Sequence, residues 1–202
     1  MPQFSNKPRW ITVHCTAASH QTAPQQFFAV NRYHKDRGFP LSSLGYYGGY
    51  HILIERDGTE LRYREDWEIG AHCNDIQDGL SMNMQSLGVC LAGNFDIEFP
   101  TPAQIETLRK RLVKWTQGYP EISYAKILPH RNWSKLKTCY GANLASDWAR
   151  KLVAGQPKDW EEDKKRARIQ ELFRQLDFLK ELLLKLKIRM GVAARQKSPP
   201  VV

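Results

Sequence analysis

The spacing of apolar residues predicts that the first three quarters of the chain alternates between strands and helices. A β-branched run over residues 10–15 predicts a strand whose successive side chains face opposite sides. Residues 50–55 and 59–64 are strand-like runs that flank an Asp-Gly turn, which predicts a hairpin. Two shorter apolar runs, at residues 87–91 and 127–128, predict two further strands.

Helix signals fall between these strands. Residues 22–25 have the pattern of a capping box, which predicts a helix from there to Gly38. Residues 101–104 have the same pattern, and apolar residues follow them at helical spacing as far as Trp115. Apolar residues at every fourth position over residues 144–152 predict a closing helix. The sum is an α/β fold, with a mixed central β-sheet flanked by helices.

Composition changes after residue 156, which predicts a folded domain over residues 1–156 and a tail over residues 157–202. From residue 158 onward, the chain has 12 lysines and arginines against 7 aspartates and glutamates. Apolar residues in the tail recur at spacings that alternate between three and four, as in a heptad seam: Ile169, Leu172, Leu176, Leu179, Leu183, Leu186 and Met190.

This pattern predicts a basic amphipathic helix, followed by a disordered end at residues 198–202. Three roles for the helix stay open. It could form a coiled-coil dimer, dock on the chain's own domain, or insert into an anionic membrane surface. A seam of only three repeats does not separate these roles.

The formal net charge is +9 at pH 7, and the sequence isoelectric point is about 9.4. Such a charge favours a polyanionic partner, which could be nucleic acid, an anionic membrane or a bacterial envelope polymer. We expect no nucleic-acid partner, because no motif that reads nucleic acid is recognisable. No stretch is long and apolar enough to span a membrane, and the first residues lack the apolar core of a secretory signal. Four cysteines without a pairing pattern indicate a reducing compartment.

Three residues far apart in the chain are candidate metal ligands. His14 stands where an apolar strand gives way to a polar loop, and His130 follows the short run at residues 127–128. Cys139 lies in a loop before the closing helix. Two imidazoles and one thiolate are a known ligand set of catalytic zinc sites. From spacing alone, a structural role for the histidines and a buried, inert role for the cysteine remain open.

Five blocks of sequence, taken in order, resemble the type-2 N-acetylmuramoyl-L-alanine amidases, a family that includes short phage endolysins and peptidoglycan recognition proteins. The blocks are ITVHCTA at residues 11–17, GYHILIERDG at 49–58, GAH at 70–72, SLGVCLAG at 86–93 and PHRNWSKLKTC at 129–139. The resemblance covers about residues 8–155 and implies the mixed sheet and flanking helices of that family.

The resemblance also implies functions for individual residues. His14, His130 and Cys139 would bind a catalytic Zn²⁺, while Tyr50 and Lys137 would assist the chemistry. The implied reaction cuts the amide bond between the lactyl group of N-acetylmuramic acid and the L-alanine of the stem peptide. Beside the metal, a lysine cation would stabilise the developing oxyanion, and a tyrosine would orient water or donate a hydrogen bond.

Other expectations are less directly tied to the resemblance. His72, Trp133 and Asn94 are candidate substrate-binding residues. Tyr140 follows the cysteine, where many relatives have proline, so the shape of the ligand loop stays open. We expect an endolysin that is made in the host cytoplasm without a signal peptide and acts on the cell wall after the inner membrane is breached. The alternative is a peptidoglycan-binding module without catalysis.

Overall fold

The computed structural model describes residues 5–18, 25–134 and 137–154, together with a few residues between 172 and 183. By its contacts the chain divides into two units, residues 1–155 and 156–202. Most of the predicted tail helix, and residues 198–202, lie outside the described residues. Those described between 172 and 183 are helical and exposed, so the three roles considered for the tail stay predictions.

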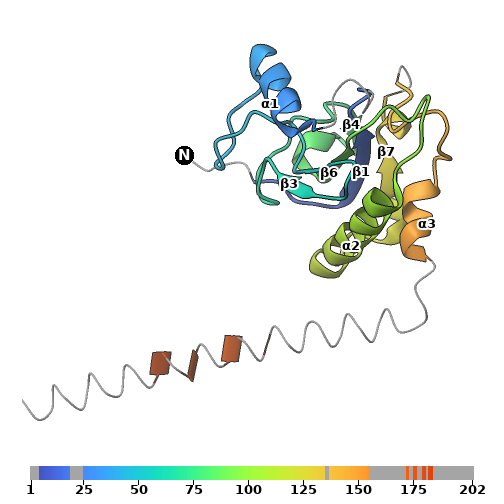
Figure 1. Ribbon diagram of the computed structural model, residues 1–202. Helices are drawn as coiled ribbons and strands as arrows, with labels where there is room; N and C mark the ends of the chain where they lie inside the picture. Colours follow the sequence, from blue (N-terminus) through green and yellow to red (C-terminus); the bar gives the residue numbers. More distant parts are fainter. Residues whose placement is uncertain are drawn as a thin grey trace, which may run out of the picture. The chain divides into compact units, whose positions relative to one another are not determined.

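The domain is built on a five-stranded mixed sheet in the order β3-β2-β6-β1-β7 (Figure 1). The strands are β1 (Trp10–Cys15), β2 (Ile52–Ile54), β3 (Glu60–Arg62), β6 (Ser86–Leu91) and β7 (Ile127–Pro129). Strand β1 runs parallel to both β6 and β7, and β2 runs parallel to β6. Only β3 is antiparallel, since it is the second strand of the predicted hairpin. The predicted α/β class is therefore confirmed.

Every residue of β6 is buried, and so is every residue of β1 after Trp10. Strands buried on both faces need cover on both sides, and the helices supply it. Figure 1 shows α2 (Pro102–Gly118) and α3 (Trp148–Ala154) together on one side of the sheet and α1 (Phe27–Asp36) on the other. On the α1 side, Phe27 and Leu53 belong to one buried apolar cluster.

The helix signals were accurate to different degrees. The capping box predicted at the start of α2 is present, because Thr101 and Gln104 each bond the other's backbone N–H. Leu108, Leu112 and Trp115 then form the buried face of that helix. The closing helix is shorter than expected, since it begins only at Trp148.

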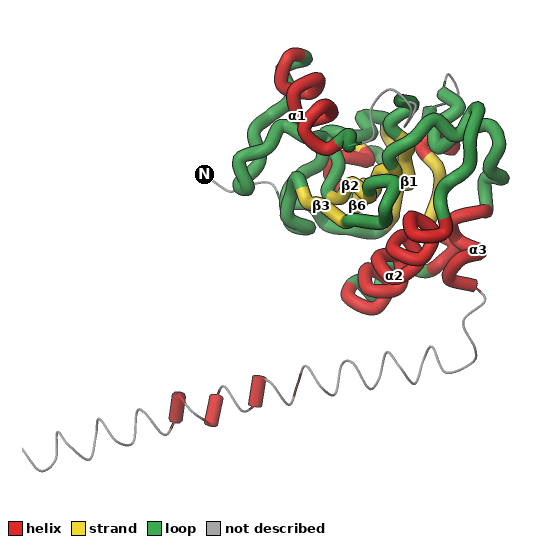
Figure 2. Tube along the Cα trace, in the orientation of Figure 1, coloured by secondary structure: helices red, strands yellow, loops and turns green. Residues whose placement is uncertain are grey.

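Loops make up much of the domain around the sheet (Figure 2). They contain a two-stranded ribbon of β4 (Ile76–Gln77) and β5 (Leu80–Ser81), and three 3₁₀ turns at Met82–Met84, Tyr124–Lys126 and His130–Asn132. The start of the first predicted helix falls partly on residues 19–24, which are outside the described residues; α1 itself begins at Phe27.

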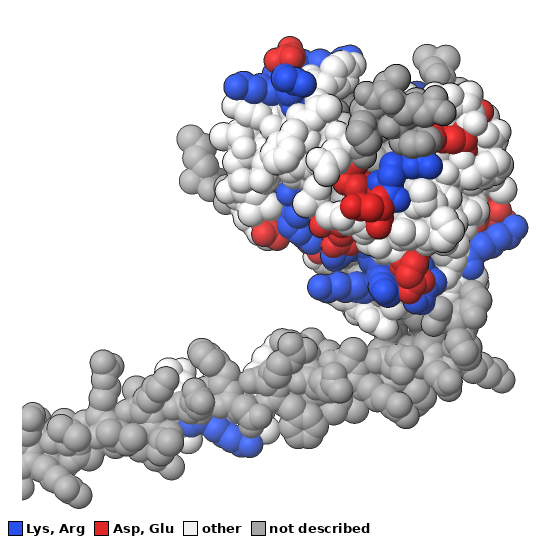
Figure 3. Space-filling model, viewed as in Figure 1, with Lys and Arg blue, Asp and Glu red and all other residues white. Residues whose placement is uncertain are grey.

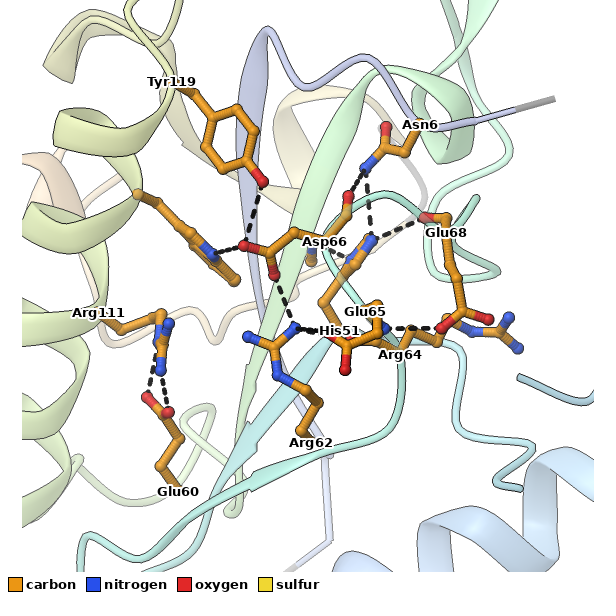
Figure 4. A network of polar contacts seen from close by, with 12 residues as sticks. Asn6, His51, Glu60, Arg62, Arg64, Glu65, Asp66, Glu68, Arg111 and Tyr119 are labelled. Atoms are coloured by element: carbon orange, nitrogen blue, oxygen red, sulfur yellow. Dashed lines mark hydrogen bonds and ion pairs between the residues drawn. The ribbon is translucent and has the colours of Figure 1, made fainter. Parts of the chain in front are cut away.

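A buried polar network ties the sheet to the loop that follows β3 (Figure 4). His51 accepts a hydrogen bond at Nδ1 from the backbone N–H of Gly88, at 2.9 Å, and its Nε2 lies 3.0 Å from the carbonyl oxygen of Glu68. Asp66 accepts hydrogen bonds from Arg62, at 2.8 Å, and from the indole of Trp115, at 2.9 Å. His51, which directly precedes β2, therefore serves the scaffold.

Basic and acidic side chains are interspersed on the face of the domain drawn in Figure 3. Several are paired across the fold, such as Arg56 with Glu98 at 3.2 Å and Arg111 with Glu60. The net positive charge is thus not gathered into one patch on this face. Among the described residues, no helix has the length and apolarity needed to cross a bilayer.

Candidate metal centre and active site

Parallel pairing of β1 with β7 brings His14 and His130 together. Val13 is the register partner of Pro129, so the residues that follow them lie side by side at one edge of the sheet. The two imidazole centroids are 4.6 Å apart. Sγ of Cys139 lies 3.7 Å from Nδ1 of His14, and the donor atoms of all three residues lie within 4.8 Å of one another.

The loop that carries Cys139 is fixed by hydrogen bonds. The backbone N–H of Cys15 donates to Sγ of Cys139 at 3.2 Å, and the N–H of Arg131 donates to the Cys139 carbonyl at 2.7 Å. Tyr140, the residue after Cys139, is fully buried and donates its hydroxyl proton to the carbonyl of Ala145 at 2.8 Å. The tyrosine thus anchors the loop in the core.

Electrostatics favour neutral imidazoles at this site. Burial, followed by repulsion from His130, lowers the pKa of His14 well below its ordinary value. Burial and the ammonium group of Lys137 lower the pKa of His130 to about 4. Both rings therefore offer an unprotonated nitrogen at neutral pH, which is the form that binds metal ions.

Without a metal ion, the environment of Cys139 favours the protonated thiol over the thiolate that binds metal. A hydrogen bond with the Cys15 side chain, and burial, raise the pKa of Cys139 well above its ordinary value. A nearby divalent cation would reverse this, because a coordinating thiol is deprotonated. The N–H of Cys15 already points at the sulfur and would stabilise the thiolate. In donor type, spacing and hydrogen bonding, the three residues fit Zn²⁺.

The three donors line an open cavity of about 450 Å³. Tyr50 lies in its wall, with its ring centroid 5.0 Å from that of His14. Burial raises the pKa of Tyr50 well above its ordinary value, so its hydroxyl keeps its proton and can donate a hydrogen bond. Lys137 is exposed at the same cavity, near enough for its charge to lower the pKa of both histidines.

The three candidate substrate-binding residues have different positions. His72 lines the cavity, although only 8% of its surface is exposed. Trp133 is not among the residues that line it and packs edge-on against Trp10, with ring centroids 5.0 Å apart. Asn94 also lies outside the lining and accepts a hydrogen bond from the N–H of Asp96. Of the three, only His72 is placed by the structure at the cavity.

Sequence patterns did not reveal the contribution of the loop between β3 and β4. Oδ2 of Asp75 lies 3.6 Å from Nε2 of His130, and Cys73, Asp75 and His130 form a second group of donors within 4.8 Å of one another. The order His72-Cys73-Asn74-Asp75 is rich in ligand-type residues, and this is the one signal that could have drawn attention to the loop.

Comparison with known proteins shows the family. The sequence profile of the N-acetylmuramoyl-L-alanine amidase family matches residues 4–142. The chain belongs to this family. Among curated relatives, it is 36% identical to the endolysin of Enterobacteria phage T3 over 59% of this chain and 76% of the relative, and 31% identical to the endolysin of Klebsiella phage KP32 over 68% and 83%.

Comparison with solved structures supports the same fold. The N-acetylmuramoyl-L-alanine amidase LysC from Clostridium intestinale URNW superposes with a TM-score of 0.58 and 26% identity, over 75% of this chain and 88% of that one. Drosophila peptidoglycan recognition protein SD shares the fold, with a TM-score of 0.55 and 22% identity over 76% and 84%. Both comparisons match the fold predicted from the family resemblance.

Proposed function

We propose that this protein is a zinc-dependent endolysin that acts on the bacterial cell wall and cleaves the amide bond between N-acetylmuramic acid and L-alanine. The observation that carries the proposal is the convergence of His14, His130 and Cys139 in an open cavity. Family membership and the phage endolysin relatives support peptidoglycan as the substrate. A binding module would need no such donor set.

Each residue around the cavity would have a separate role in amide hydrolysis. Zinc held by three protein ligands lowers the pKa of water to about 7 and polarises a carbonyl group. Lys137 supplies a positive charge at the cavity, where it stabilises the negative charge that develops on the carbonyl oxygen. Tyr50 keeps its proton and donates a hydrogen bond to the reacting groups. With a metal ion bound, the N–H of Cys15 would stabilise the sulfur of Cys139 as a thiolate ligand.

The test is release of stem peptides from purified peptidoglycan. We expect the protein as isolated to free peptides that begin with L-alanine, a metal chelator to abolish the release, and added Zn²⁺ to restore it. Mass spectrometry of the soluble products identifies the cut bond. Equal release with and without chelator would contradict the role of zinc, and peptidoglycan binding without release would favour the non-catalytic alternative.

Removing the hydroxyl of Tyr50 should slow the reaction and leave the metal in place. A hydrogen bond to a charged group is worth about 1.5–3 kcal/mol, so Tyr50→Phe should lower turnover about 10- to 100-fold. Tyr124→Phe is the matched control, because Tyr124 is exposed and lies outside the cavity lining. Steady-state kinetics and zinc content of both variants are the measurements. Unchanged turnover in Tyr50→Phe would show that its hydroxyl has no part in the reaction.

A further inference from the structure

The ring of His14 is held from both sides. Its Nδ1 faces the sulfur of Cys139 at 3.7 Å, and its Nε2 lies 3.0 Å from Nδ1 of His72. His14 is 1% exposed, so its ring has little contact with solvent. The orientation of the ring, and the nitrogen that carries its proton, are therefore set by the side chains that touch it.

We propose that His72 is a positioning residue, which fixes His14 in the one tautomer that can bind the metal. This proposal rests on the proposed zinc site. A neutral imidazole carries one N–H, and the nitrogen that binds a metal ion must be unprotonated. Because Nδ1 of His14 faces the other donors, its proton belongs on Nε2, from which it is donated to Nδ1 of His72.

The backbone around His72 is fixed by one side chain. Oδ1 of Asn83 accepts hydrogen bonds from the N–H groups of both His72 and Cys73, each at 2.7 Å. The N–H of Ala71 donates to the carbonyl of Gly49 at 2.9 Å, which anchors the segment to the chain just before β2. The acceptor nitrogen is thus presented from a segment with little freedom to move.

Two glycines leave a slot for the ring of His72. A Cβ atom at Gly70 would lie 2.5 Å from Cδ2 of the ring, and one at Gly88 would lie 2.6 Å from the same atom. Any other residue at either position would displace the imidazole. The close fit indicates a ring held in one position, with its Nδ1 presented to His14.

Replacing His72 should have different effects on KM and on metal affinity, depending on whether it positions His14 or binds substrate. A residue that contacts only substrate would change KM and leave the metal bound as before. A residue that orients a ligand changes metal affinity, and loss of such an outer contact typically costs about 10- to 100-fold. Zinc affinity, measured by competition with a chromophoric chelator, is therefore the informative readout, and it requires no catalysis.

Asparagine and leucine form a matched pair for the experiment, since they are similar in shape but only asparagine has an acceptor atom near the place of Nδ1. We expect His72→Leu to weaken zinc binding about 10- to 100-fold and His72→Asn to retain affinity close to that of the unaltered protein. His72→Ala, which removes the acceptor without adding bulk, should behave like His72→Leu. Circular dichroism of the metal-free variants reports whether each one is folded.

His34→Asn is the control, because His34 is another buried histidine of the cavity, and its Nδ1 accepts a hydrogen bond from the N–H of Gly49. Its zinc affinity should not change. If folded His72→Leu and His72→Ala bind zinc as tightly as the unaltered protein, the positioning role is overturned. If the unaltered protein itself binds no zinc, the proposed function fails first, and the two failures are distinguishable.

Discussion

Cys139→Ser is expected to lose most of its bound zinc and nearly all of its activity. A serine hydroxyl is a far weaker zinc ligand than a thiolate, and the N–H of Cys15 that now faces the sulfur would have no anion to stabilise. Loss of the metal removes several kcal/mol of transition-state stabilisation, which corresponds to a fall in turnover of about 1000-fold. Zinc content by mass spectrometry and peptide release from peptidoglycan are measured on the same preparation.

Cys73→Ser is the matched control for this variant. Cys73 belongs to the second group of donors, with Asp75 and His130, and the two groups share only His130. We expect Cys73→Ser to keep its zinc and its activity. The reverse result, with zinc lost from Cys73→Ser and retained by Cys139→Ser, would place the metal in the second group and contradict the proposed site.

The class of fold could be predicted from local patterns because most elements carry their own signal. The run at residues 10–15 and the capping box of Thr101 gave β1 and the start of α2 at nearly their observed positions. The order of strands in the sheet is not a local property. Pairing of β1 with both β6 and β7 depends on contacts between residues more than 70 positions apart, such as Trp10 with Ser86.

Local sequence patterns predict the positions of the three candidate metal ligands to different degrees. His14 and His130 each end or follow a predicted strand, and parallel pairing then places them together. Spacing alone could not do the same for Cys139, which is placed by a loop and by its contacts with Cys15 and Arg131. Sequence context offered Cys139 as one candidate with an inert role still open, and the family resemblance implied that it binds zinc with the two histidines.

The contacts that residues around the metal ligands make with them cannot be predicted from sequence patterns. The segment from Gly70 to Asp75 has neither helical nor strand periodicity, and its position depends on Asn83 and on the space left by Gly88. From the sequence, His72 is predicted only as a candidate substrate-binding residue, and its hydrogen bond with His14 is visible only in three dimensions.

Lys137→Met is expected to leave zinc in place and to lower turnover about 100- to 1000-fold, which is the typical cost of losing one donor to a developing oxyanion. Methionine keeps an unbranched apolar stem and removes only the charged end. Since Lys137 is exposed at the cavity and is not one of the metal donors, zinc content should match that of the unaltered protein.

The kinetic constants decide what the charge of Lys137 does. Loss of an interaction made only in the transition state lowers kcat and leaves KM nearly unchanged, whereas loss of an attraction for an anionic substrate raises KM with little change in kcat. Lys114→Met is the control, because Lys114 is exposed on α2 and does not line the cavity. A change confined to KM, or an equal change in the Lys114 variant, would contradict the oxyanion role. A fall in kcat that is specific to Lys137→Met, with zinc retained, would place its charge beside the carbonyl oxygen in the transition state.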